Sequence, residues 1–151
     1  SNPFLVLNGD SLCELDPERL LRFHTSKRAR ATIAVTQADS REDTGAVTLG
    51  EDDRVLSMVE KARTRTTGYH NAGIYLFDRT VEALFPNSRS WSLERELLPQ
   101  LVTEPFYGFV TASALYDIGT PERLVHFREV WKDPSVHFPV TSMHQEQGSL
   151  L

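Results

Sequence analysis

The sequence predicts an α/β fold with a mixed sheet flanked by helices, because short apolar runs alternate with helix-start signals. Residues 4–8 form a continuous apolar run that a Gly-Asp pair ends. A run this short suits a strand buried on both faces better than a buried helix. Asp16 and Pro17 then supply an N-cap and a proline at the first helical position. Strands that alternate with helices in this way indicate the α/β class.

The remaining segments continue this alternation, with one hairpin inserted. Residues 45–49 and 55–59 flank an acidic turn and predict an antiparallel pair, which makes the sheet mixed. The acids of that turn are expected to be solvated rather than to bind metal. Further strands are predicted at residues 31–37, 68–77, 106–110 and 115–118, and further helices at 79–85, 93–101 and from Thr120 onward. The helix at 93–101 is expected to be interrupted or tilted near Pro99.

Composition limits the classes of protein to consider. The 151 residues fit one domain, which we place at residues 1–131, with a loosely docked tail at 132–151. A net charge of −5 argues against a non-specific nucleic-acid binder. No apolar stretch approaches the ~20 residues that span a bilayer, so no membrane association is expected. Cys13 is the single cysteine, which fits a reducing compartment, and we expect a cytoplasmic location.

Two acidic residues mark a candidate metal site. Asp10 and Asp117 each end an apolar, strand-like run and precede helix-start residues. Ligands of open α/β sheets bind outside the carboxyl ends of the strands, and Mg²⁺ prefers one or two carboxylates together with substrate phosphates. The pattern therefore predicts a Mg²⁺ site at the edge of the sheet. The alternatives are a turn aspartate for Asp10 and a helix-capping role for Asp117.

Six short motifs, taken in order, resemble the sugar-phosphate nucleotidyltransferases. They are Leu7-Asn8-Gly9-Asp10, Gly45-Ala46-Val47, Glu60-Lys61, Asn71-Ala72-Gly73, Ser92-Leu93-Glu94 and Asp117-Ile118-Gly119-Thr120-Pro121. The sequences of the last motif and of residues 106–109 look most like those of the branch that makes GDP-activated heptose or mannose. Within that branch they are closest to the D-glycero-D-manno-heptose 1-phosphate guanylyltransferases. The resemblance implies a Rossmann-like nucleotide-diphospho-sugar transferase fold.

The resemblance also implies an activity. A nucleotidyl group would pass from a nucleoside triphosphate, with GTP expected, to a heptose or mannose 1-phosphate, and pyrophosphate would leave. The product would be a precursor of lipopolysaccharide or surface polysaccharide. Because the attacking phosphate oxygen is already anionic, no general base is needed, and catalysis comes from positioning and electrostatic stabilisation. Asp10, Asp117 and Lys61 would be the catalytic residues, with Asp10 and Asp117 binding Mg²⁺.

Substrate-binding roles follow from the same resemblance. Glu60 would accept sugar hydroxyls, Lys61 would contact the sugar's phosphate, and Asn71 would hold a hydroxyl through both its donor and its acceptor atoms. Gly45 and Gly73 would permit close approach of the backbone to the sugar. The alternatives are a surface ion pair for Glu60 and Lys61, a turn role for Asn71, and a β-bulge at either glycine.

The glycine-rich loop that opens this family's sequences does not occur in the chain. We therefore interpret residues 1–131 as the C-terminal portion of a nucleotidyltransferase domain, and expect the chain alone to be inactive. A central strand without its neighbours would expose an edge, so a homo-oligomer is expected. Two other functions stay open: uridylyl or thymidylyl transfer to a glucose- or muramate-type sugar 1-phosphate, and a non-catalytic module that binds sugar phosphate or oligomerises.

Overall fold

A computed structural model describes residues 2–37, 45–59, 68–86 and 89–132 of the chain. The predicted tail lies outside these residues except for Lys132. No helix within the described ranges has the length and apolar character needed to cross a membrane.

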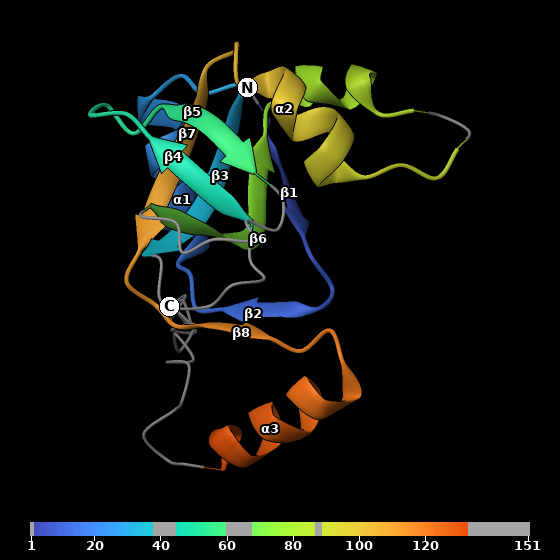
Figure 1. Cartoon of the computed structure of the whole chain (residues 1–151). Coiled ribbons are helices and arrows are strands. Elements are labelled where there is room, and N and C mark those ends of the chain that lie inside the picture. The colour runs from blue at the N-terminus through green and yellow to red at the C-terminus, as the bar shows by residue number, and fades with distance from the viewer. Residues whose placement is uncertain (1, 38–44, 60–67, 87–88, 133–151) are drawn as a thin grey trace, which may run out of the picture.

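The sheet is built around strand β6 (Tyr69–Phe77). One edge of β6 pairs with β3 (Ala31–Gln37), and the other pairs with β4 (Ala46–Leu49) and β1 (Phe4–Leu7). Strand β5 (Val55–Val59) extends the sheet beyond β4, and β7 (Phe106–Thr111) extends it beyond β3. The β3–β7 pair is parallel and the other pairs are antiparallel. The mixed α/β sheet predicted from the sequence is therefore confirmed (Figure 1).

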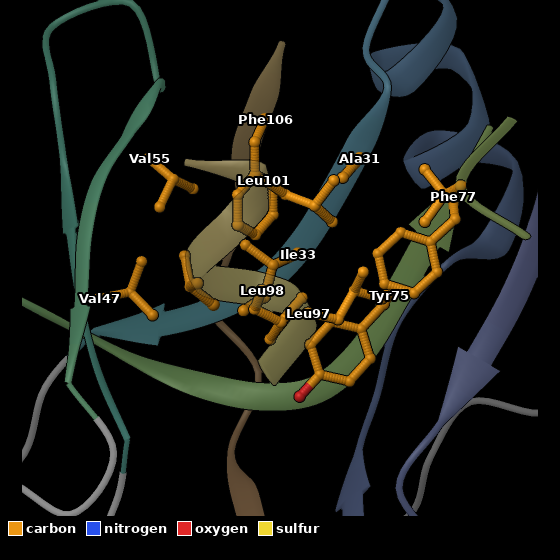
Figure 2. Close-up of a cluster of buried hydrophobic side chains, with 12 residues drawn as sticks. Ala31, Ile33, Val47, Val55, Tyr75, Phe77, Leu97, Leu98, Leu101 and Phe106 are labelled. Carbon is orange, nitrogen blue, oxygen red and sulfur yellow. The ribbon is translucent and has the colours of Figure 1, made fainter. Parts of the chain in front are cut away.

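Helical segments cover both faces of this sheet. The larger core cluster packs one face against η1 (Arg79–Leu84), η2 (Leu93–Leu97) and α2 (Leu98–Leu101). Figure 2 shows Leu97, Leu98 and Leu101 inserted among the side chains of the strands. On the opposite face, α1 (Pro17–Ser26) contributes Leu20 to a second cluster. Three layers thus bury the apolar faces of the strands.

A small two-stranded ribbon stands apart from the main sheet. It pairs β2 (Ser11–Cys13) with β8 (Leu115–Asp117) in antiparallel register, and α3 (Pro121–Trp131) follows β8 (Figure 1). Thr120 caps α3 by accepting a hydrogen bond from the backbone N–H of Arg123, at 3.3 Å. The ribbon brings together the ends of two chain segments that are more than 100 residues apart in sequence.

Strand β1 differs from its prediction. The continuous apolar run predicts a strand buried on both faces, yet Leu5 is 44% exposed and Leu7 60% exposed. Phe4 and Val6 pack against the larger core cluster. Among the described residues β6 is the one strand that pairs with β1, so β1 lies at a sheet edge and only alternate side chains are covered.

Local signals account for the first helix. The Asp16 carboxylate accepts hydrogen bonds from the backbone N–H groups of Glu18 and Arg19, at 2.9 and 3.2 Å, which confirms the predicted cap. Leu20 and His24 lie one helical turn apart and are both buried, but Leu21 is exposed. The buried stripe of α1 is therefore narrower than its apolar residues suggest.

His24 is a buried histidine with one unpaired ring nitrogen. Its Nδ1 lies 2.8 Å from Thr32 Oγ1, and its Nε2 has no hydrogen-bond partner. Burial lowers the pKa of His24 below its usual value, and the negative charge of Asp78 offsets part of that effect. The folded state therefore favours the neutral imidazole, since a protonated Nε2 would be a buried charge without a partner.

We expect the stability of the fold to fall in mild acid. The pKa of His24 is lower in the folded than in the unfolded chain, so its contribution is complete above the unfolded value and is lost as the pH falls below that value. Urea unfolding of the wild type between pH 7.5 and 5.0 should show this decrease. His24→Asn cannot titrate and should flatten the dependence, whereas the exposed control His126→Asn should retain it. Equal pH slopes for all three proteins would contradict the assignment.

Candidate active site

The β2–β8 ribbon brings Asp10 and Asp117 together. Ser11 lies opposite Asp117 in the strand register, and the backbone N–H of Ile118 donates to the carbonyl of Asp10, at 2.8 Å. A Cβ atom placed on Gly119 would lie 3.2 Å from Asp10 Oδ2 and 3.2 Å from Asp117 Oδ1. The two carboxylates therefore flank one glycine, and a larger residue at position 119 would crowd them.

The hydrogen bonds of these carboxylates leave room for a cation. Asp117 Oδ1 accepts from the backbone N–H of Gly119, and Asp117 Oδ2 pairs with Arg123 Nη1 at 2.5 Å. Asp10 is exposed, and within the described residues its Oδ1 accepts a single long bond of 3.4 Å, from Ser11 Oγ. No cluster of three or more His, Cys, Asp or Glu side chains suited to a metal occurs in the described part of the chain. Two accessible carboxylates fit Mg²⁺, which keeps several waters and takes further oxygens from substrate phosphates.

Gly45, Asn71 and Gly73, predicted to bind the sugar, form a second group. The backbone N–H of Asn71 donates to the carbonyl of Gly45, at 3.0 Å. The backbone N–H of Gly73 donates to Asn71 Oδ1, at 2.9 Å. The structure therefore places these three residues next to one another, at the junction of β4 with β6.

Gly73 occupies a bulge in β6. The register of β3 with β6 shifts between Ile33 and Val35, so that residues 72–74 of β6 lie opposite the single residue Ala34. Gly73 has a φ of 72°, in the left-handed region that glycine adopts without steric cost. The backbone N–H of Asn8 donates to the carbonyl of Gly73, at 2.8 Å. The bulge and the close approach of a second chain segment thus occur together at this glycine.

The Asn71 amide already has two partners within the chain. Its Oδ1 accepts from Gly73, and its Nδ2 donates to the Tyr75 hydroxyl, at 2.7 Å. One amide hydrogen and one oxygen lone pair remain for a ligand. Asn71 can therefore contact a hydroxyl through both atoms and still keep these internal bonds.

Glu60 and Lys61 fall outside the described residues. The residue before them, Val59, pairs with Ala46 at the end of the β4–β5 hairpin. A Cβ atom on Gly45 would lie 3.9 Å from the carbonyl oxygen of Val59. The chain therefore leaves β5 beside the group formed by Gly45, Asn71 and Gly73.

Glu94, Tyr75 and Asn8 were not among the predicted site residues. Glu94 Oε1 accepts from Asn8 Nδ2 at 3.3 Å and from the Tyr75 hydroxyl at 3.2 Å. Figure 2 shows the Tyr75 ring in the core cluster with its hydroxyl oxygen directed out of it. Glu94 and Asn8 also line an open pocket, completed by Leu7, Gly9 and Asp10. Glu94 and Asn8 belong to motifs that carry the family resemblance, which is the signal that could have identified them.

The segment with Glu94 is a π-helix, whereas the sequence predicts a helix at 93–101 that is interrupted or tilted near Pro99. Residues 93–97 form the π segment η2, capped by Ser92, whose hydroxyl accepts from the backbone N–H of Arg95 at 3.2 Å. Pro99 follows within α2. In a continuous α-helix the ring of Pro99 would clash with the carbonyl of Arg95, which gives a physical reason for the wider turn. Such short π segments often lie at functional sites.

Comparison with known proteins identifies similar chains. The pattern of the family described as "Nucleotidyl transferase" matches residues 1–132. Mannose-1-phosphate guanylyltransferase from Mycobacterium tuberculosis is 40% identical over 124 residues, which cover 80% of this chain and 34% of that protein. The catalytic subunit beta of mannose-1-phosphate guanylyltransferase from Dictyostelium discoideum is 31% identical, with coverage of 80% and 34%. The chain thus spans about a third of the length of these curated relatives.

A solved structure shares the fold. The crystal structure of HddC from Yersinia pseudotuberculosis superposes with a TM-score of 0.73 and 30% sequence identity, covering 87% of this chain and 56% of HddC. A second crystal structure of HddC, complexed with GMP-PN, superposes with a TM-score of 0.72.

The bulge at Gly73 allows a direct test of the site's geometry. In Gly73→Ala the new methyl group would lie 3.0 Å from Asn8 Cβ, on a left-handed backbone. We expect a loss of roughly 1–2 kcal/mol in the free energy of unfolding from the left-handed conformation alone. Gly9→Ala is the matched control, because a Cβ there meets nothing within 4 Å. Urea denaturation of both variants gives the comparison, and equal stabilities would rule out a special role for the Gly73 conformation.

Proposed function

Because the chain belongs to the nucleotidyl transferase family, we propose that it forms part of an enzyme that transfers a guanylyl group from GTP to a mannose- or heptose-type sugar 1-phosphate, giving a GDP-sugar and pyrophosphate. The observation that carries the proposal is the pair of carboxylates, Asp10 and Asp117, on either side of Gly119. The choice of GTP is supported by the guanylyltransferase relatives and by the GMP-PN complex of HddC.

Mg²⁺ is the cofactor that this donor set would suit. Asp10 and Asp117 would hold it, and the ion would neutralise the charge that grows on the departing pyrophosphate. The Asp117 carboxylate is already held in place by the backbone N–H of Gly119 and by Arg123. These two contacts would keep its oxygens fixed in position, so that little reorganisation accompanies ligand binding.

The sugar side of the reaction would use Gly45, Asn71 and Gly73. The two glycines let the substrate approach the backbone, and the remaining donor and acceptor of the Asn71 amide would take a sugar hydroxyl. Glu60 and Lys61 are proposed to complete this side, with Lys61 paired to the sugar's phosphate and contributing to catalysis. The chain's part in the reaction is thus to place the phosphate nucleophile in line with the α-phosphorus.

We also propose a cytoplasmic location and a product used in lipopolysaccharide or surface polysaccharide synthesis. Burial, with the negative charge of Glu14 as a second cause, raises the pKa of the Cys13 thiol to about 11, so this thiol is unreactive at neutral pH. An unreactive single cysteine and a nucleoside triphosphate substrate both suit the cytoplasm.

The activity and its carboxylates can be tested together. A protein of the relatives' length that contains this chain should release pyrophosphate from GTP and mannose 1-phosphate in the presence of Mg²⁺. Asp10→Asn and Asp117→Asn should each lower kcat by about 100-fold or more, because the amide keeps the shape and loses the charge. Asp52→Asn, in the exposed turn between β4 and β5, is the matched control and should leave kcat unchanged.

Other results of that assay would favour other functions. Preferred use of UTP or dTTP with glucose- or muramate-type sugar 1-phosphates would replace the guanylyl assignment. Binding of sugar phosphate without turnover of any nucleotide would support a non-catalytic module. We expect the 151-residue chain on its own to give no turnover, because it spans about a third of the length of its relatives.

The exposed edge of β1 supports a proposal of self-association. Leu5 and Leu7 present apolar side chains on a strand that is paired along one edge within the described residues. We expect the 151-residue chain to form dimers or larger species that grow with concentration in light scattering coupled to size-exclusion chromatography. Lysines at both positions, Leu5→Lys and Leu7→Lys, should restore the monomer, whereas Val125→Lys on α3 should not. A monomer at every concentration would refute the proposal.

A further inference from the structure

Five residues form a closed circuit of hydrogen bonds between the end of β1, the bulge of β6 and η2. Around this circuit Asn8 N donates to Gly73 O (2.8 Å), Gly73 N to Asn71 Oδ1 (2.9 Å) and Asn71 Nδ2 to the Tyr75 hydroxyl (2.7 Å). The Tyr75 hydroxyl then donates to Glu94 Oε1 (3.2 Å), which also accepts from Asn8 Nδ2 (3.3 Å). Each member is therefore held by two others.

Glu94 is the charged member of this circuit. It determines which group donates and which accepts in its hydrogen bond with Tyr75. One oxygen of its half-buried carboxylate accepts from both Asn8 and Tyr75, and no ion pair joins it to a Lys or Arg of the described ranges. A hydroxyl has one hydrogen, so a Tyr75 hydroxyl that donates to Glu94 must accept from Asn71. The Asn71 amide then presents its Nδ2 to Tyr75 and its Oδ1 to Gly73. Through Tyr75, Glu94 thereby supports the orientation of an amide that it does not contact, the same orientation that the Gly73 N–H requires.

Burial of Tyr75 supports the assignment of its hydroxyl as the donor to Glu94. Desolvation raises the pKa of the Tyr75 phenol above its usual range, although the hydrogen bond from Asn71 offsets part of the shift. The hydroxyl therefore stays protonated and remains a donor to Glu94.

The two ends of the circuit reach the two halves of the site. Asn8 stands two residues before Asp10 on the segment that leaves β1, whereas Asn71 contacts both Gly45 and Gly73. The fit between the halves is tight, because a Cβ atom on Gly73 would lie 3.0 Å from Asn8 Cβ and 3.1 Å from Asn8 Cγ. A displacement of the Asn8 side chain would therefore disturb the bulge.

We propose that Glu94 is a positioning residue that holds the sugar-binding group of Gly45, Asn71 and Gly73 in register with the Asp10 and Asp117 carboxylates, acting through Asn8 and Tyr75. The role rests on the proposed function of the two groups. The role is exerted through Glu94 Oε1, which accepts from two donors within the chain.

Side-chain amide signals in NMR spectra of the labelled 151-residue chain test the circuit without any ligand. Glu94→Ala should shift the Asn71 side-chain amide signals, although Asn71 has no direct bond to Glu94, and Glu94→Gln should restore them because its amide oxygen can accept both bonds. Glu96→Ala is the control for loss of a carboxylate in the same helix, since Glu96 pairs with Arg89 outside the circuit. Unchanged Asn71 signals in a folded Glu94→Ala protein would overturn the proposal.

Titration of the same proteins with mannose 1-phosphate in excess Mg²⁺ tests the positioning role. Glu94→Ala and Tyr75→Phe should each weaken binding by about tenfold, as residues that orient ligand-binding groups typically do. The double variant should bind no more weakly than either single variant, because both changes open one circuit. Glu94→Gln and Tyr107→Phe, a tyrosine on β7, should bind nearly as the wild type does.

The two arms separate failure of this inference from failure of the proposed function. Wild-type affinity in Glu94→Ala and Tyr75→Phe, or additive losses in the double variant, would overturn the positioning role while leaving the proposed function intact. A wild-type chain that does not bind mannose 1-phosphate would contradict the sugar-binding assignment, and the positioning role with it.

Discussion

The left-handed backbone at Gly73 is the constraint on which the geometry of the candidate site depends. It lets β6 carry three residues opposite Ala34 of β3, and it leaves space at the Cα atom for the Asn8 side chain. Asn71 then closes the turn by accepting from the Gly73 N–H. A residue with a Cβ atom would strain the backbone and meet Asn8, so both the bulge and the adjoining strand end require glycine at this position.

The carboxylate pair depends on a different device, the short β2–β8 ribbon. Asp10 and Asp117 are 107 positions apart in the chain, and the ribbon places them on either side of Gly119. The Asp117 carboxylate is ordered by its own turn and by Arg123, whereas Asp10 is exposed and weakly bonded. A preordered carboxylate beside an accessible one suits a hydrated divalent ion that also takes phosphate oxygens. The candidate site thus has an ordered carboxylate on the Asp117 side and an exposed one on the Asp10 side.

Much of the fold was predictable because its signals are local. The Asp16-Pro17 cap, the hairpin around the acidic turn and the alternation of strands with helices depend on neighbours within a few residues, and each is found in the structure. Strand β1 was predicted, but its burial on both faces was wrong, because an apolar run does not show how many strands pair beside it. The π segment at residues 93–97 was also missed, since a proline within a helical pattern indicates a distortion but not its form.

The sequence by itself determined the class of the fold and the family, and it predicted the two acidic positions, because each rests on residue types in a short, ordered pattern. Only the tertiary structure decided that Asp10 meets Asp117 across Gly119 and that Glu94 joins Asn8 and Tyr75 in one hydrogen-bonded circuit. The physical reason is that these contacts link segments far apart in the chain. Their partners are set by strand register and by the bulge at Gly73, which no local pattern specifies.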